Sequence, residues 1–179
     1  MTEDGLPIID ILQLSEGLPA ITPAFGSALV EAIAICLQDQ NHPSGHLFSI
    51  EGDFQAQVRL NYPTVTEQMQ RCWNDEAYTT EQAAYGIAFL LIRHLTSLTI
   101  IERSRRGTGF DYWLGLAQED LPFQRMMRLE VSGIRQGNRR LVNARVKLKK
   151  AQVDRVQSPL PAYVIIVEFS TPRSHISQV

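Results

Sequence analysis

Cysteine is scarce in this 179-residue chain, which contains two, Cys36 and Cys72. Two thiols cannot form a disulfide framework or a four-thiolate zinc site, so both classes of protein are excluded. Cys36 falls in a helical apolar pattern and Cys72 in a polar segment, and we expect both to be reduced thiols. The four histidines are scattered without metal-ligand spacing, and none is proposed as catalytic.

Long apolar runs are also missing. The longest, around Ile87 to Leu95, contains Arg93 and His94 and falls far short of the roughly 20 residues that cross a bilayer. The N-terminal stretch MTEDGLPIIDILQL is acidic and lacks a basic leader. We therefore expect no membrane span, no secretion and a cytoplasmic location.

Basic residues are rare in the first part of the chain. Residues 1–81 contain two basic and twelve acidic residues, whereas residues 82–179 contain fifteen basic and seven acidic residues. Such an asymmetry could present a basic face to phosphates, or the two parts could neutralise each other by packing together, and composition leaves both open. The hydrophobic content of 44% predicts a single globular domain with a sizeable core.

The first part of the chain predicts a helix and a hairpin. Apolar residues recur at nearly 3.6-residue spacing over 23–38, which indicates an amphipathic helix. Residues 46–62 alternate apolar and polar around a Glu-Gly-Asp turn, which indicates two paired strands, and a short helix is expected after Pro63. We interpret residues 1–78 as an acidic N-terminal extension of a core formed by residues 79–179.

The second part predicts a mixed α/β arrangement. A helix is expected from Thr79 or Thr80 as the N-cap, with Glu81 in its positively polarised first turn. Strands are then expected at 98–102, 110–115, 125–134 and 161–169, with a helix at 138–152 before the last of them. The apolar residues of that second helix fall on one face, formed by Leu141, Ala144, Leu148 and Ala151. This order predicts an α/β fold in which a mixed central sheet is flanked by helices.

Two carboxylates occupy strand positions that normally exclude charge. Side chains alternate along a strand, so Asp111 shares a face with Trp113, and Glu130 shares a face with Arg128 and Ser132. If the two strands pair, Asp111 and Glu130 meet on one side of the sheet and can hold Mg²⁺. The alternative is that they form ion pairs with Arg128 or Arg103.

Together these residues resemble the restriction-endonuclease-like superfamily, the PD-(D/E)XK nucleases, over roughly residues 79–169. Gly109-Phe110-Asp111 looks like its aspartate motif, and Glu130-Val131-Ser132 looks like its Glu-X-Lys motif. Glu81 is our candidate for the further acidic residue that many members carry in the first helix. The resemblance implies a restriction-endonuclease-like core, a Mg or Mn cofactor and hydrolysis of a phosphodiester.

Ser132 departs from the family pattern, because lysine usually stands at that position. Some relatives place this positive charge on the following helix, and Lys149 is our candidate for it. Arg145 one turn earlier and Gln152 one turn later share the same flank of that helix. In the implied mechanism Asp111 and Glu130 hold the metal, while Lys149 or Arg145 stabilises the charge that develops on the phosphate.

Basic residues near these motifs predict contacts with a nucleic-acid backbone. One group precedes the second strand of the core and comprises Arg103, Arg105 and Arg106. A second group lies on the last predicted helix and includes Arg139, Arg140, Lys147 and Lys150, for which a solvated helix face is the alternative. Elsewhere, Glu168 at the end of the final strand is expected to pair with Arg173.

Two hypotheses of different class follow from these residues. The first is a metal-dependent nuclease that acts on or binds nucleic-acid phosphodiesters. The second is a non-catalytic module with a degenerate nuclease fold, which contacts a protein partner through its acidic N-terminal part. A small-molecule pocket beneath the aromatic strand and a homo-oligomer remain open, and no membrane partner is expected.

Overall fold

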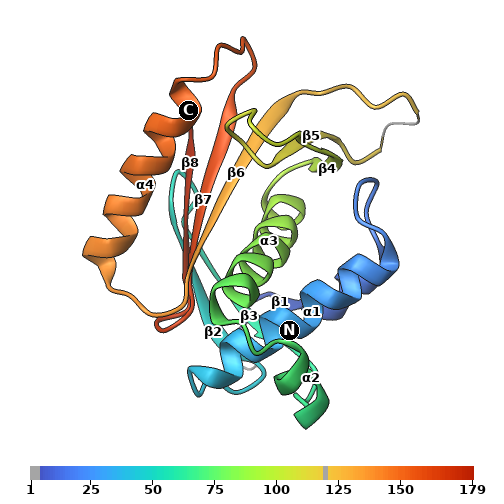
Figure 1. The fold of residues 1–179 in the computed structure, drawn as a ribbon, viewed down its shortest axis with the longest axis vertical. Helices are drawn as coiled ribbons and strands as arrows, with labels where there is room; N and C mark the ends of the chain where they lie inside the picture. The colour runs from blue at the N-terminus through green and yellow to red at the C-terminus, as the bar shows by residue number, and fades with distance from the viewer. Residues whose placement is uncertain (1–4, 119–120) are drawn as a thin grey trace.

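The computed structural model describes residues 5–118 and 121–179, which form an α/β fold around one mixed sheet of eight strands (Figure 1). The strand order across the sheet is β1-β3-β2-β8-β7-β6-β5-β4. The strands are β1 (Ile8–Asp10), β2 (His46–Gly52), β3 (Ala56–Asn61), β4 (Leu98–Arg103), β5 (Tyr112–Leu116), β6 (Met127–Ile134), β7 (Ala162–Glu168) and β8 (Arg173–Gln178). The helices are the 3-10 helix η1 (Ile11–Glu16), α1 (Pro23–Asp39), α2 (Glu67–Cys72), α3 (Glu76–Leu95) and α4 (Arg139–Asp154). Among the described helices, none has the length and apolar character that crossing a bilayer requires.

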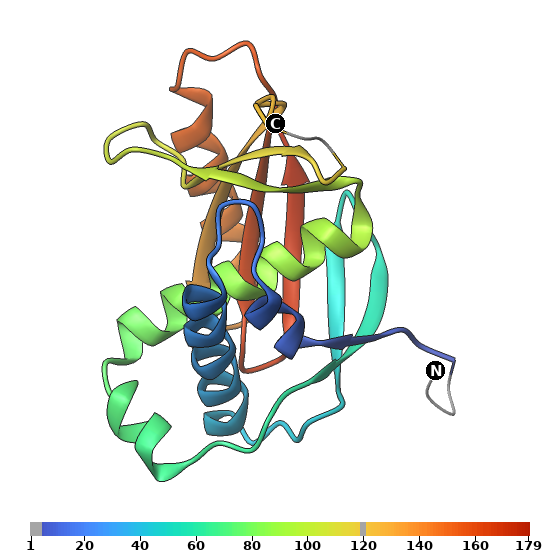
Figure 2. The same cartoon turned by 90° about the vertical axis from the view of Figure 1, so that its right-hand side faces the viewer.

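The second part of the chain follows the predicted order. Strands β4, β5 and β6 form an antiparallel meander, and β7 pairs with β6 in parallel after the α4 crossover. Helix α3 packs directly on β6, where Gly133 allows the approach: a Cβ there would lie 2.6 Å from the carbonyl oxygen of Thr80. Helix α4 covers the opposite face of the sheet (Figures 1 and 2).

The first part of the chain extends the same sheet. Strand β8 pairs with β7 in antiparallel fashion and with β2 in parallel, so it joins the predicted hairpin β2–β3 to the core. Helix α1 packs on α3 (Figure 2), and one hydrophobic cluster contains Leu29 and Ile33 of α1 together with Phe89 of α3. The boundary predicted at residue 78, between the N-terminal extension and the core, falls inside α3.

Helix α3 begins earlier than the sequence predicted. Its N-cap is Asp75, whose carboxylate accepts a hydrogen bond from the Tyr78 amide at 2.9 Å. Thr79 and Thr80 are buried inside the helix, and their hydroxyls donate to the carbonyl oxygens four residues earlier. The prediction of a threonine cap was therefore wrong, and Glu81 lies in the second turn.

Helix α4 buries a face that differs from the apolar face of the sequence pattern. Its buried side chains are Val142, Val146 and Val153, which pack on the outer residues of β7 in a small second core. Leu141 and Leu148 are 40% and 62% exposed. The leucine face is thus partly exposed, most of all at Leu148.

Candidate active site

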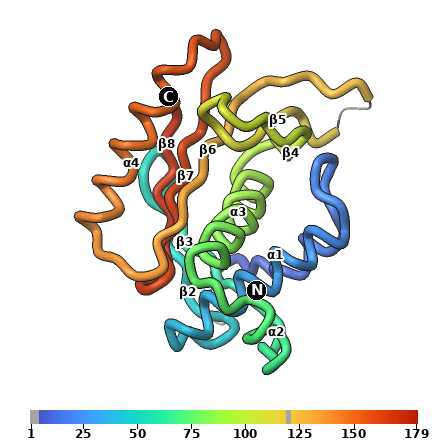
Figure 3. The backbone as a smooth tube through the Cα atoms, viewed as in Figure 1, coloured from blue at the N-terminus to red at the C-terminus, as the bar shows by residue number. Residues whose placement is uncertain are grey.

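Several of the predicted site residues converge at one end of the sheet, where the β4–β5 turn approaches α4 (Figure 3). A cavity of about 700 Å³ opens there. Its walls include seven residues selected from the sequence, namely Glu81, Arg103, Arg105, Arg106, Asp111, Glu130 and Gln152. We call this space the active-site cavity.

Asp111 lies immediately before β5 and takes part in the backbone ladder of the sheet. Its amide donates to the Leu129 carbonyl at 2.8 Å, and its Oδ2 accepts from the Val131 amide at 2.8 Å. Oδ1 accepts from the Tyr85 hydroxyl at 3.0 Å. Burial raises the pKa of Asp111, while these two hydrogen bonds and the nearby Lys149 oppose the rise. The carboxylate is therefore held in one orientation at the edge of the cavity.

Glu130 is buried in the middle of β6, with 2% of its surface exposed. It pairs with Val164 of β7, whose side chain belongs to the core beneath α4, so Glu130 also faces α4. Its Oε1 accepts from Lys149 Nζ at 2.6 Å and from Gln152 Nε2 at 3.1 Å. Burial and the negative charge of Asp111 raise the pKa of Glu130 to about 7, because together they outweigh Lys149 and Gln152.

Two basic side chains of helix α4, Lys149 and Arg145, reach β6. Lys149 bonds to Glu130 and, at 3.2 Å, to the Gln152 side-chain oxygen. Arg145 takes a different partner, donating to Ser132 Oγ at 2.7 Å. Lys149, and not Arg145, therefore reaches the Glu130 carboxylate.

Gln152 ties the helix to the β4–β5 turn. Its amide nitrogen donates to the Gly109 carbonyl at 3.1 Å as well as to Glu130. Gly109 has a φ of 82°, and a Cβ there would lie 2.6 Å from Val156 Cγ2. Both the backbone conformation and the close packing require glycine at this position.

Tyr85 was not predicted as a site residue. It lies one turn after Glu81 on α3, and its hydroxyl is 3.3 Å from Glu81 Oε1 and 3.0 Å from Asp111 Oδ1. Burial and Asp111 raise the pKa of Tyr85, so the hydroxyl keeps its proton and remains a donor. The four-residue spacing from Glu81 was a usable signal, but a tyrosine within an apolar helix stripe is more often a core residue.

The carboxylates offer a limited set of metal ligands. Across residues 5–118 and 121–179, no group of three or more His, Cys, Asp or Glu side chains is arranged to hold a metal ion. Asp111 and Glu130 border the same cavity as Glu81, which is exposed on α3. Two carboxylates suit Mg²⁺, which retains several water ligands and binds phosphate, provided that Lys149 gives up Glu130 Oε1.

The alternative ion pairs with arginine are not formed among the described residues. Arg128 donates to the carbonyl oxygens of Val153 at 3.2 Å and Leu160 at 3.0 Å. The Arg103 guanidinium lies 5.7 Å from the centre of the Tyr112 ring. Asp111 and Glu130 thus bond to amide, hydroxyl and ammonium donors instead.

The two predicted basic groups lie in different places. Arg103, Arg105 and Arg106 line the active-site cavity. On α4, Arg139 pairs with Glu51 at 2.8 Å, and Lys147 and Lys150 border a separate hollow along the helix, which Asn143 and Val146 also line. Arg140 is exposed near the start of the helix.

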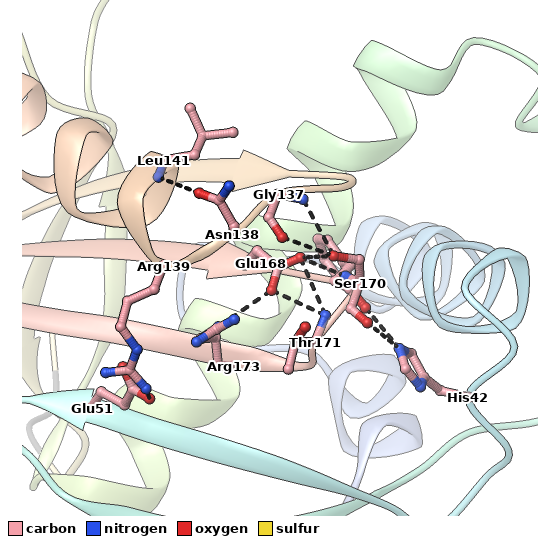
Figure 4. A network of polar contacts seen from close by, with 11 residues as sticks. His42, Glu51, Gly137, Asn138, Arg139, Leu141, Glu168, Ser170, Thr171 and Arg173 are labelled. Atoms are coloured by element: carbon pink, nitrogen blue, oxygen red, sulfur yellow. Dashed lines mark hydrogen bonds and ion pairs between the residues drawn. The ribbon is translucent and has the colours of Figure 1, made fainter.

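A second polar cluster surrounds Glu168, as the sequence predicted (Figure 4). Glu168 is fully buried and pairs with Arg173 at 3.3 Å. It also accepts from the amides of Ser170 at 2.7 Å and Thr171 at 3.0 Å, while His42 contacts the Ser170 carbonyl at 3.1 Å. Because Glu168 bonds to Ser170, Thr171 and Arg173, the cluster holds the β7–β8 turn together.

No protein-family model matches the chain, and comparison with curated proteins and with solved structures gives no match either.

Proposed function

We propose that the protein is a metal-dependent nuclease with a restriction-endonuclease-like core, acting on nucleic-acid phosphodiesters. Support comes first from the order α3-β4-β5-β6-α4-β7, a helix, three antiparallel strands, a helix and a further strand. The two acidic motifs stand at the start of the second of these strands and within the third. This is the arrangement that the sequence resemblance implies.

The observation that carries the proposal is the contact between Lys149 Nζ and Glu130 Oε1 at 2.6 Å. Ser132 cannot supply the cation that the family motif normally provides. Lys149 brings an ammonium group to the same carboxylate from the neighbouring helix, and Gln152 supports it. An ion pair with a purely structural role needs no cavity beside it. Glu130, however, borders a cavity that Arg103, Arg105 and Arg106 also line.

Each residue then has a distinct role. Asp111 and Glu130 would hold Mg²⁺ or Mn²⁺, which when bound acidifies a water molecule and neutralises phosphate oxygens. Lys149 stabilises negative charge that develops on the phosphate, and the arginines of the β4–β5 turn attract the nucleic-acid backbone. Tyr85 fixes the orientation of Asp111.

Cleavage of plasmid DNA and of labelled single-stranded DNA and RNA in Mg²⁺ or Mn²⁺ tests the proposal. Asp111→Asn and Glu130→Gln should abolish the activity, and Lys149→Met should reduce it by about 10²-fold or more. Asp154→Asn is the matched control, because Asp154 is an exposed carboxylate on α4 away from the cavity. A folded protein that cleaves none of these substrates with either metal contradicts the proposal.

The exposed leucine face of α4 favours a second candidate, a non-catalytic module that binds a protein partner. Leu141 and Leu148 stand on the outside of the helix, where a partner could cover them. This candidate predicts no affinity for Mn²⁺ by calorimetry and no cleavage. Retained metal binding that depends on Asp111 would argue against it.

A further inference from the structure

A second, smaller cavity lies next to the active-site cavity. It has a volume of about 320 Å³ and is bordered by Glu102, Ser104, Arg105, Thr108, Trp113 and Arg125. Ser104 and Arg105 also line the active-site cavity, so the two spaces are neighbours across the β4–β5 turn. We call the smaller space the Trp113 pocket.

Trp113 is on the same face of the sheet as Glu130. It pairs with Arg128, which stands two residues before Glu130 on β6. Its neighbours Tyr112 and Leu114 point the other way, into the main core, where Tyr112 meets Phe89 of α3. Only part of the Trp113 side chain is buried, unlike these two neighbours.

The guanidinium of Arg125 lies over the Trp113 ring, so a base would stack on the outer side of the guanidinium or on the ring surface that it leaves uncovered. This guanidinium lies 4.7 Å from the centre of the Trp113 ring system and makes three contacts of 2.6–2.8 Å with the Glu102 carboxylate. Phe110 meets the same tryptophan edge-on, with 4.6 Å between ring centres. The pocket therefore offers an aromatic ring and a guanidinium plane whose orientation is already set.

The chemistry of the Trp113 pocket differs from that of its neighbour. Glu102 neutralises Arg125 there, whereas the active-site cavity contains Arg103 and Arg106 besides the shared Arg105. Planar aromatic and guanidinium surfaces are what single-stranded nucleic acids stack their bases on, and a cavity of this size is at the lower limit for a small ligand. The active-site cavity holds its arginines together with the carboxylates Glu81, Asp111 and Glu130, whereas the stacking surfaces lie in the Trp113 pocket.

We propose that the Trp113 pocket binds a nucleobase adjacent to the phosphodiester in the active-site cavity, so that the substrate is a single-stranded nucleic acid. This inference rests on the proposed function, because it assigns the substrate class of the same site. A base within a duplex is paired and stacked, and it must leave the stack to reach a pocket of this kind. Single strands and frayed ends have no such cost.

Equilibrium binding measured by fluorescence anisotropy in EDTA tests the inference without cleavage. The probes are strands of about 12 nucleotides: single-stranded DNA, single-stranded RNA, duplex DNA, and single-stranded DNA with abasic central positions. The wild type should bind at least one base-containing single strand about tenfold more tightly than the abasic strand and the duplex. Comparison of DNA with RNA identifies the preferred sugar.

Trp113→Leu should remove most of this preference while leaving affinity for the abasic strand unchanged. Trp73→Leu is the matched control, because Trp73 follows α2 at the opposite end of the molecule from β5 (Figure 1). Arg125→Gln supplies a second test if Trp113→Leu fails to fold, since the Arg125 side chain is 49% exposed. Arg125→Gln should also reduce the preference for the base-containing strand over the abasic strand, measured as the ratio of their dissociation constants.

Equal affinity of the wild type for abasic and base-containing strands, or tighter binding of the duplex, overturns the inference. Cleavage in Mg²⁺ or Mn²⁺ without any base preference would reject the pocket and retain the nuclease. A base preference that depends on Trp113, in a protein that cleaves nothing, would retain the pocket and reject the hydrolysis.

Discussion

At the scale of single residues, the proton on Glu130 would control metal binding in the proposed nuclease. Burial and Asp111 raise the pKa of Glu130 to about 7, so near neutral pH part of the population carries a neutral glutamic acid. A metal ion binds the ionised form, and binding therefore releases this proton. Affinity for Mn²⁺ should rise with pH and level off once Glu130 is fully ionised.

Below pH 7 the Mn²⁺ affinity should increase about tenfold for each pH unit, and above about pH 8 it should be constant. Calorimetric titrations between about pH 5.5 and pH 8.5 measure the slope. The Glu130→Gln variant should bind Mn²⁺ weakly, and its affinity should depend less on pH than that of the wild type. An affinity for Mn²⁺ that stays flat through this range in the wild type would show that the carboxylate is not a ligand.

Tyr85 gives a second prediction at the residue scale. Tyr85→Phe keeps the ring that packs on Phe89 and Tyr112 but removes the hydroxyl that orients Asp111. Loss of such an orienting hydrogen bond should weaken Mn²⁺ binding by about 10-fold or more. Tyr112→Phe is the matched control, because the Tyr112 hydroxyl is buried and has no hydrogen-bond partner among the described residues. Equal effects of the two variants would contradict a positioning role for Tyr85.

Strand alternation selected Asp111 and Glu130, whereas Glu81 and Lys149 were selected through the family resemblance, and the arginines through their clustering in the sequence. The two strand carboxylates stood out because charge is rare in strands, and Gln152 followed from its spacing from Lys149 on one helix flank. Tyr85 carried no comparable signal. The pairing of Lys149, rather than Arg145, with Glu130 depends on how α4 is rotated over β6, which periodicity does not fix.

At the scale of elements, α4 illustrates this limit most clearly. Two different faces of the helix are apolar, one with leucine and alanine and one with valine, and the valine face is the buried one. The sequence shows both faces, but only the sheet decides between them. Strand β8 was not predicted from the sequence. Its sequence is RSHISQ, and its buried residues include Ser174 and Ser177. It therefore lacks the alternation of apolar and polar residues that indicates a strand.

The burial of α4 predicts unequal effects of substitution on its two faces. Val142→Ala should lower the free energy of unfolding by about 1–2 kcal/mol, because it leaves a gap against β7. Leu148→Ala should change it by less than about 0.5 kcal/mol, since Leu148 is largely exposed. Urea denaturation measures both values. A larger loss in Leu148→Ala would mean that this face is covered in solution.

At the scale of the whole molecule, the asymmetric charge is neutralised internally only in part. Within residues 5–118 and 121–179, two ion pairs join the acidic first part to the basic second part, Arg135–Asp39 and Arg139–Glu51. Arg105 and Arg106 are exposed at the active-site cavity and belong to no ion pair among the described residues. Internal pairing therefore accounts for part of the asymmetry, and Arg105 and Arg106 remain exposed in a cavity that also contains Glu81, Asp111 and Glu130.

The positions of the exposed arginines predict which basic side chains contact a nucleic-acid backbone. For single strands, the logarithm of the binding constant falls with the logarithm of salt concentration by about 0.7 for each phosphate contacted. If each arginine contacts one phosphate, the double variant Arg105→Gln, Arg106→Gln should therefore reduce the slope by about 1.4. The matched double variant Arg139→Gln, Arg140→Gln should leave the slope nearly unchanged, because Arg139 is paired with Glu51 and neither residue lines the active-site cavity. Anisotropy titrations over a range of salt concentrations measure both slopes. If the Arg139/Arg140 variant reduced the salt dependence as much as the Arg105/Arg106 variant, the nucleic-acid backbone would have to contact the start of α4. That result would contradict binding at Asp111 and Glu130.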